Sequence, residues 1–169
     1  MYVELNCKSN FSFLRGASDS REYIARAIEL RMPAIGIADM NGVYALPRAY
    51  EMIRDHAPEM KLLCGAEIAI SGAPSITLIA RTRTAWGLLC RIITQTHCGK
   101  IKGEGFLTCE ELKFLTSRFK GVEDLVCILK NDTKNDFKFL TTVFSERTYL
   151  SLCRYLDGLD NARTDQALK

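Results

Sequence analysis

The sequence predicts an α/β fold with a mainly parallel sheet. Over most of the 169 residues, short apolar segments alternate with amphipathic segments that have helical spacing. The apolar segment at 34–39 (AIGIAD) shows no polar alternation, which is typical of a parallel strand buried on both faces. No G-x-G-x-x-G motif follows the first expected strand, so a Rossmann fold is not indicated.

The first half of the chain is expected to contain two strands, each followed by a helix. The first strand alternates apolar and polar residues, and a Ser-Asp-Ser sequence then provides N-caps for the first helix. A proline in its first turn marks the second helix. In chain order, the four elements are a strand at 2–7, a helix at 21–32, a strand at 34–39 and a helix at 46–56.

The second half departs once from the alternation of strands and helices. Two strands are separated only by a Gly-Ala-Pro turn and are expected to form a hairpin. Farther on, Thr108 and Glu111 have the spacing of a capping box at the start of a helix. The expected strands are at 61–70, 75–80, 124–129 and 148–154, and the expected helices are at 84–96, 108–117, 133–144 and 160–169.

Charge and composition favour a cytoplasmic globular protein. The net charge of +3 is smaller than that of a dedicated nucleic-acid binder. No apolar run reaches the roughly 18–20 residues that span a membrane, and the N-terminus lacks the pattern of a signal peptide. The seven cysteines have no metal-binding spacing. Five of them lie among apolar residues, which predicts buried, reduced thiols: Cys7, Cys64, Cys90, Cys127 and Cys153.

Four motifs in a fixed order carry a resemblance to a known family. They are YVELNCKSNFSFLRGAS at 2–18, AIGIADMNGVYALPRAY at 34–50, LLCGAEIAI at 62–70 and ARTRTAWGLLCRIIT at 80–94. With them, the chain resembles the PHP (polymerase and histidinol phosphatase) domain at the N-terminus of bacterial C-family DNA polymerase alpha subunits, and most closely the error-prone branch. The stretch YLSLCRYLDGLDNART at 149–164 also resembles a later strand and turn of this family. The resemblance implies a distorted (βα)7 barrel, with 1–169 as a single domain that is incomplete at its C-terminal end, as in a fragment of a longer polymerase.

The resemblance also implies where metal ligands would lie. Active PHP domains bind metal with a His-x-His pair after the first strand and an Asp-His pair after the second. Here the first pair falls on Asn6 and Lys8, and the second histidine falls on Met40. Because an ammonium group only donates hydrogen bonds and repels a cation, we expect Lys8 to pair with Asp39 or Glu67 in place of a metal ion.

We therefore expect a degenerate metal site, with no catalytic residue and no confident metal ligand. The chain has two histidines, and each is expected at the end of a helix, where a surface or capping role is the simplest interpretation. The vestigial metal candidates are Asp39, Glu67 and His97.

Two functions follow from the resemblance, and the sequence leaves both open. The first is a non-catalytic, structural PHP domain in DNA replication, repair and translesion synthesis, without a cofactor and with the polymerase body and accessory subunits as partners. The alternative is a phosphoesterase or 3′–5′ exonuclease acting on DNA that needs zinc, manganese or magnesium. Five basic residues either line a path for DNA or form an ordinary solvated face: Arg81, Arg83, Arg91, Lys100 and Lys102.

Overall fold

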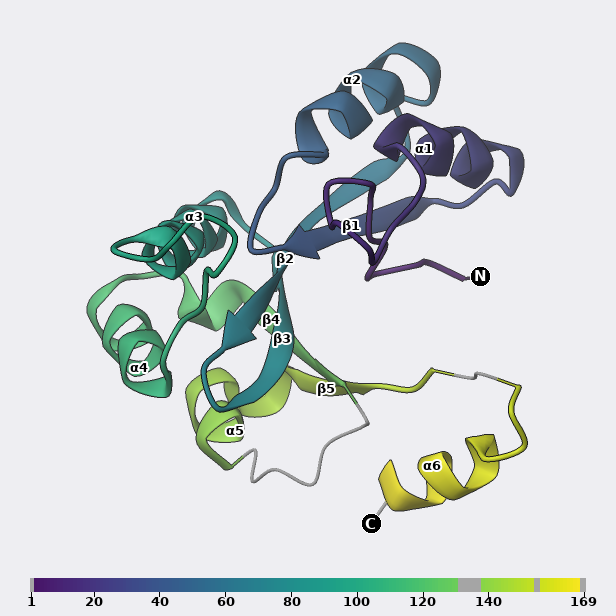
Figure 1. Ribbon diagram of the computed structural model, residues 1–169. Coiled ribbons are helices and arrows are strands. Elements are labelled where there is room, and N and C mark those ends of the chain that lie inside the picture. The colour runs from purple at the N-terminus through teal and green to yellow at the C-terminus, as the bar shows by residue number, and fades with distance from the viewer. Residues whose placement is uncertain (1, 131–137, 154–155, 168–169) are drawn as a thin grey trace.

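The computed structural model describes residues 2–130, 138–153 and 156–167, and its strands form one five-stranded sheet (Figure 1). The strands are β1 (Ala34–Met40), β2 (Lys61–Ile70), β3 (Ala73–Ala80), β4 (Leu125–Lys130) and β5 (Thr148–Ser151). The helices are α1 (Ser20–Glu29), α2 (Leu46–His56), α3 (Arg83–His97), α4 (Cys109–Arg118), α5 (Lys138–Phe144) and α6 (Asp160–Ala167). None of these described helices has the length and apolar character needed to cross a bilayer.

The five strands follow one another across the sheet in chain order. β1 and β2 are parallel, as are β4 and β5, whereas β2–β3 and β3–β4 are antiparallel. The expected hairpin is thus confirmed, because a tight turn joins β2 to β3. The expectation of a mainly parallel sheet with one hairpin is confirmed for the described residues, because β1, β2, β4 and β5 run in the same direction and the hairpin reverses β3.

The capping residues indicated by the sequence begin their helices. The side chain of Asp19 accepts the backbone N–H of Arg21, and Glu22 completes a capping box at the start of α1. Thr108 and Glu111 form the expected capping box of α4. In both helices, side chains thus satisfy N–H groups that have no partner within the helix.

The elements near the C-terminus differ from the expectation in extent. α5 covers the described part of the helix expected at 133–144, and residues 133–137 lie outside the described residues. β5 ends at Ser151, where it pairs with Lys130 of β4, and the next two described residues are not in a strand. The expected end at 154 lies outside the described residues. α6 follows as expected and is described as far as Ala167.

The strand expected at 2–7 is not formed as a regular strand. The segment lies beside β1, where the N–H of Gly36 donates to Glu4 O at 2.7 Å and the N–H of Cys7 donates to Gly36 O at 3.2 Å. Only an isolated bridge between Cys7 and Ile37 results. The reason is local, because the carboxylate of Glu4 accepts the N–H groups of the next two residues at 2.9 Å and so interrupts the ladder.

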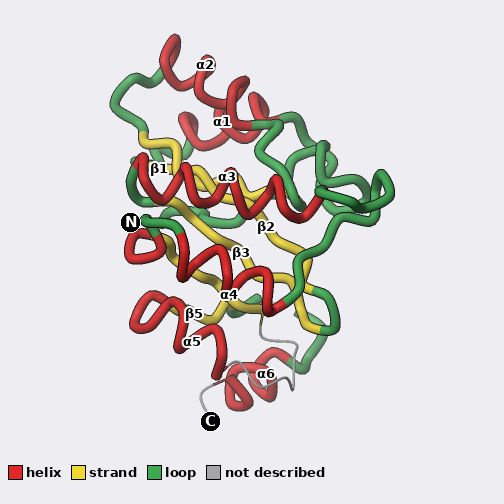
Figure 2. Tube along the Cα trace, turned by 90° about the vertical axis from the view of Figure 1, so that its left-hand side faces the viewer, coloured by secondary structure: helices red, strands yellow, loops and turns green. Residues whose placement is uncertain are grey.

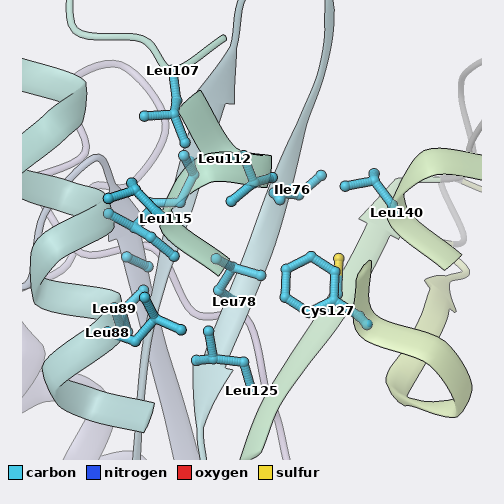
Figure 3. Packing of buried hydrophobic residues seen from close by; sticks show 14 of the residues in the cluster. Ile76, Leu78, Leu88, Leu89, Leu107, Leu112, Leu115, Leu125, Cys127 and Leu140 are labelled. Atoms are coloured by element: carbon cyan, nitrogen blue, oxygen red, sulfur yellow. The ribbon is translucent and has the colours of Figure 1, made fainter. Parts of the chain in front are cut away.

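The helices cover one face of the sheet with an apolar core. Side chains alternate along a strand, so alternate residues of β3 and β4, such as Leu78 and Cys127, point toward α3, α4 and α5. Figure 2 shows these three helices one after another along the sheet, and Figure 3 shows Leu78 and Cys127 beside Leu125. A second apolar cluster packs α1 and α2 against β1 and includes Ile24 and Ile53.

The cysteines are less uniformly buried than the sequence predicted. Cys127 lies in the core, and the expected cysteines at 7, 64 and 90 are half-buried. Cys153 is exposed, so the prediction of burial is wrong there, because this residue follows the end of β5 and leaves the sheet.

Candidate functional site

Polar side chains gather on the face of the sheet opposite the helices. Glu67 and Thr77 are register partners on β2 and β3, whereas their neighbours Ala66 and Leu78 point into the helix-covered core. The hydroxyl of Thr77 donates to the amide oxygen of Asn6, in the N-terminal segment, at 3.1 Å. We call the connected set the Glu67 cluster, and it consists of Asn6, Lys8, Arg15, Glu67, Ser75, Thr77 and Lys130.

Glu67 is fully buried and is surrounded by hydrogen-bond donors. Its Oε1 accepts Nζ of Lys130 at 2.7 Å, Nη1 of Arg15 at 3.0 Å and the hydroxyl of Ser75. Nζ of Lys8 lies 3.0 Å from the other oxygen, Oε2. An isolated buried charge is costly, so this carboxylate depends on its partners.

Lys8 is the most buried of the three cations. Its side chain is 14% exposed, against 36% for Lys130 and 49% for Arg15. Its ammonium group also donates to Oδ1 of Asn6 at 2.5 Å and to the carbonyl of Ala38. The ammonium group thus makes two hydrogen bonds and one ion pair, and Oε2 of Glu67 accepts no hydrogen bond from the residues that the structure describes. Lys8 therefore ties the N-terminal segment to β1 and β2 at once.

The charges of the cluster change the pKa of its members. Burial raises the pKa of the Glu67 carboxyl, but the charge of Lys8 and the hydrogen bonds from Lys130 and Ser75 outweigh burial and lower the pKa to about 2. Burial lowers the pKa of the Lys8 ammonium, and the carboxylate of Glu67 opposes that lowering. Glu67 is therefore ionised at neutral pH.

Asp39 lies at the end of β1, only 1% exposed, and binds the loop that follows the N-terminal segment. Its Oδ1 accepts the N–H of Ser9 at 2.7 Å and the hydroxyl of Ser12 at 2.6 Å, and its Oδ2 accepts the hydroxyl of Ser9 at 2.7 Å. Of the two carboxylates expected as partners of Lys8, the one at ion-pair distance is Glu67.

The hydrogen bond of the His97 ring involves neither Glu67 nor Asp39. Its Nε2 donates to the backbone carbonyl of Asn41 at 2.7 Å, an assignment that follows from the carbonyl being an acceptor. The side chain of Asn41 accepts the N–H of Ala69 at 2.9 Å and donates to the carbonyl of Gly105 at 2.6 Å. Asn41 thus fixes the ends of β1 and β2 to the loop after α3.

Several members of the site had no strong sequence signal. Arg15, Asn41 and Ser75 have residue types that are common in loops and at the ends of strands, and nothing in their local sequence marks them as members of a buried cluster. Lys130 reaches Glu67 across 63 residues of sequence. The available hint was a lysine at the end of an otherwise apolar strand, LVCILK, which indicates a charged side chain that needs a partner.

The residues at the expected metal positions do not fit a metal ion. Lys8 places an ammonium group on Glu67, where a cation would bind, and the amide oxygen of Asn6 already accepts two hydrogen bonds. Both oxygens of Asp39 accept from serines, and Met40, the register partner of Glu67, offers only a thioether. Across residues 2–130, 138–153 and 156–167, no three His, Cys, Asp or Glu side chains form a group that could hold a metal.

The basic residues considered for DNA contact are spread along α3. Arg81 and Arg83 lie at the start of the helix, and Lys100 and Lys102 follow its end. A helix of 15 residues is about 22 Å long, so these pairs lie at opposite ends. Arg91 lies between them, over an aromatic ring. Contact of these residues with DNA stays a prediction.

Comparison with curated proteins finds relatives named error-prone DNA polymerase. The chain is 33% identical over 169 residues to that of Pseudomonas aeruginosa, a match that covers 99% of this chain and 16% of the relative. It is 44% identical over 105 residues to that of Anaeromyxobacter sp. strain K, covering 59% of this chain and 9% of the relative. The chain thus spans less than a fifth of the length of these polymerases.

Two solved structures share the fold. One, from Bifidobacterium adolescentis, is assigned as a metal-dependent phosphoesterase, with a TM-score of 0.54, 12% identity, and coverage of 98% of this chain and 83% of that one. The other is an amidohydrolase from Chromobacterium violaceum, with a TM-score of 0.53, 13% identity and the same coverage. Residues 4–141 match the model of the PHP domain. The chain therefore belongs to the PHP domain family.

Proposed function

We propose that the chain is a non-catalytic PHP module of an error-prone C-family DNA polymerase, with a structural role in replication, repair and translesion synthesis. Its family and the names of its relatives support the polymerase context. The Glu67 cluster supports the structural role, because it joins the N-terminal segment, β2, β3 and β4 through protein side chains alone. The partners in this proposal are the polymerase body and its accessory subunits.

The contact that carries the proposal is the 3.0 Å ion pair between Lys8 and Glu67. In a metal-dependent hydrolase, buried carboxylates hold a cation that activates water. Here the ammonium group of Lys8 supplies a positive charge 3.0 Å from the buried carboxylate. The carboxylate is therefore used for stability, and the module needs no cofactor.

The experiment measures bound metal and hydrolysis in the 169-residue chain. The purified protein is dialysed against zinc or manganese, and its metal content is determined by mass spectrometry. Hydrolysis of bis-p-nitrophenyl phosphate and of single-stranded DNA labelled at the 5′ end is followed with each ion. We expect no stoichiometric metal and no hydrolysis above that of the Glu67→Gln variant. Activity that persists unchanged in Glu67→Gln would come from a contaminating enzyme.

The second candidate function is a metal-dependent phosphoesterase or 3′–5′ exonuclease. The similarity in fold to a protein assigned as a metal-dependent phosphoesterase favours this alternative. It requires an ion bound at or near Glu67, Asp39 and His97. Stoichiometric zinc or manganese, lost together with DNA hydrolysis in Glu67→Gln, would select this function and refute the structural one.

A further inference from the structure

The loop at 9–18 presents apolar side chains to solvent at one end of the sheet. Phe13 is 83% exposed, Leu14 is 89% exposed and Phe11 is 41% exposed. Tyr44, 58% exposed, follows β1 and lies beside Phe11, with ring centroids 6.1 Å apart and the rings tilted by 43°. We call these four residues the loop patch. Neighbouring exposed apolar side chains of this kind mark interaction sites.

The base of the loop is fixed by many hydrogen bonds. Ser9 and Ser12 bind Asp39, and the N–H groups of Arg15 and Gly16 donate to the carbonyl of Ser12 at 2.8 and 3.1 Å. A Cβ at Gly16 would lie 2.2 Å from the carbonyl oxygen of Lys8, so only glycine permits this close approach. The loop therefore holds the loop patch in one position, which lowers the entropy cost of binding.

One residue of the loop tip adopts a conformation that side chains rarely take. Leu14 has a φ of 60°, in the left-handed region, although leucine is not favoured there. Such strain persists only where the surrounding structure imposes it, and it is frequent at binding sites. The loop thus keeps the apolar side chain of Leu14 exposed to water, although a relaxed loop could turn this side chain toward the protein.

Two arginines linked through Asp19 accompany the loop patch, and one of them lies over a ring. Arg48 lies over the ring of Phe11, 5.4 Å from its centroid. Arg48 and Arg21 are 50% and 62% exposed, while their shared partner Asp19 is 19% exposed. Glu22 is an exposed carboxylate on this side, and its side chain accepts the N–H of Asp19. The guanidinium of Arg48 therefore places a positive charge on a ring of the loop patch, and both arginines share one half-buried anionic partner.

We propose that the loop patch binds single-stranded DNA, with bases stacking on Phe11, Phe13 and Tyr44 and phosphates pairing with Arg21 and Arg48. Proteins bind single strands by combining aromatic stacking platforms with cations that follow the backbone. The fixed rings and the arginine over Phe11 provide both parts. This site goes beyond the proposed structural role and does not depend on whether Glu67 holds a metal.

The test is fluorescence anisotropy of a fluorescein-labelled dT20 oligonucleotide titrated with the 169-residue chain at low salt. Phe13→Ala is expected to weaken binding at least about fivefold, since stacking on one ring supplies about 1–3 kcal/mol per base. Arg48→Ala is expected to weaken binding and to reduce the slope against salt by about one. Both side chains are exposed, so these variants are expected to keep the wild-type melting temperature.

Phe114→Ala is the matched control, because Phe114 on α4 is 58% exposed and Arg118 lies 5.8 Å from its ring. Its affinity for dT20 should stay within twofold of wild type. Equal losses in Phe114→Ala and Phe13→Ala, or no binding of dT20 at low salt, would overturn the proposal. Loss in Arg83→Ala with wild-type binding in Phe13→Ala would place DNA on α3 instead. Dimers in sedimentation that Phe13→Ala abolishes would assign the loop patch to a second copy of the chain.

Discussion

The buried carboxylate of Glu67 needs positively charged partners in order to be stable in this PHP domain. Glu67 has no solvent exposure, and three cations and a hydroxyl contact it. Removing one partner from a buried ion pair costs more than the pair itself contributes, because the remaining charge stays desolvated. The lysine in the N-terminal segment and the glutamate of β2 therefore depend on each other.

The lowered pKa of Glu67 predicts a loss of stability in acid. Because the pKa falls from its ordinary value of 4.5 to about 2 on folding, the unfolded chain binds a proton more tightly than the folded chain. This contribution of about 3 kcal/mol is present above pH 4.5 and is lost as the pH falls toward 2. Urea unfolding from pH 7 to pH 3 measures it. The free-energy difference between wild type and Glu67→Gln should shrink over this range, and a constant difference would contradict the prediction.

Asp39 is predicted to be a structural residue of the loop rather than a free carboxylate. Asp39→Asn replaces an acceptor oxygen by an NH₂ group that faces donors of Ser9 and Ser12. The unsatisfied donors should lower the free energy of unfolding by about 1–3 kcal/mol. Urea denaturation checks this value. Ser117→Ala, which removes an exposed hydroxyl, serves as the control, and equal stability of Asp39→Asn and wild type would refute the role.

At the level of elements, strong local signals predicted helices better than strand pairing. N-cap residues and apolar spacing placed α1, and a capping box placed α4, because helical hydrogen bonds are local. The N-terminal segment has the alternation of a strand, but its ladder depends on β1 and on the side chain of Glu4. Pairing of this kind is set by the tertiary structure, which periodicity alone does not encode.

Gly36 is predicted to set the distance between the N-terminal segment and β1. A Cβ at this position would lie 2.5 Å from the carbonyl oxygen of Leu5, so Gly36→Ala should displace the segment and destabilise the fold by about 1–3 kcal/mol. Thermal melting measures the effect, and amide exchange of residues 4–8 should rise. A Cβ at Gly87, in α3, has no neighbour within 4 Å, so Gly87→Ala should stabilise the fold by about 0.5–1 kcal/mol. Equal effects of the two changes would contradict this assignment.

The whole molecule brings the N-terminal segment close to the last strand. The segment lies beside β1, at one edge of the sheet, and also lines a cavity of about 450 Å³ together with Tyr149 and Ser151 of β5. The sheet therefore curves until its two edges face each other across the cavity. The resemblance to PHP domains anticipated this barrel-like fold, and the sequence pattern anticipated the one hairpin that reverses β3, whereas the register of the strands came only from the structure.

The family resemblance predicted the residues of the site that occupy the family's metal-ligand positions, and it did not predict their other partners. The motifs pointed to Lys8 and Glu67, and to their pairing as one of two alternatives. Lys130 and Arg15 could not be assigned, because contacts across 63 and 52 residues depend on the complete fold. The loop patch was also missed, because apolar residues near a turn give no sign of their exposure.

The central claim is that Lys8 and Glu67 stabilise the fold as a coupled pair without a metal ion. A double-mutant cycle of Lys8→Met and Glu67→Gln, with unfolding by urea in the presence of EDTA, measures this coupling directly. We predict that each single change costs about 3 kcal/mol and that the double variant costs less than their sum by at least about 1.5 kcal/mol. Additive costs in EDTA, together with a stabilisation of wild type by zinc or manganese that Glu67→Gln abolishes, would contradict it.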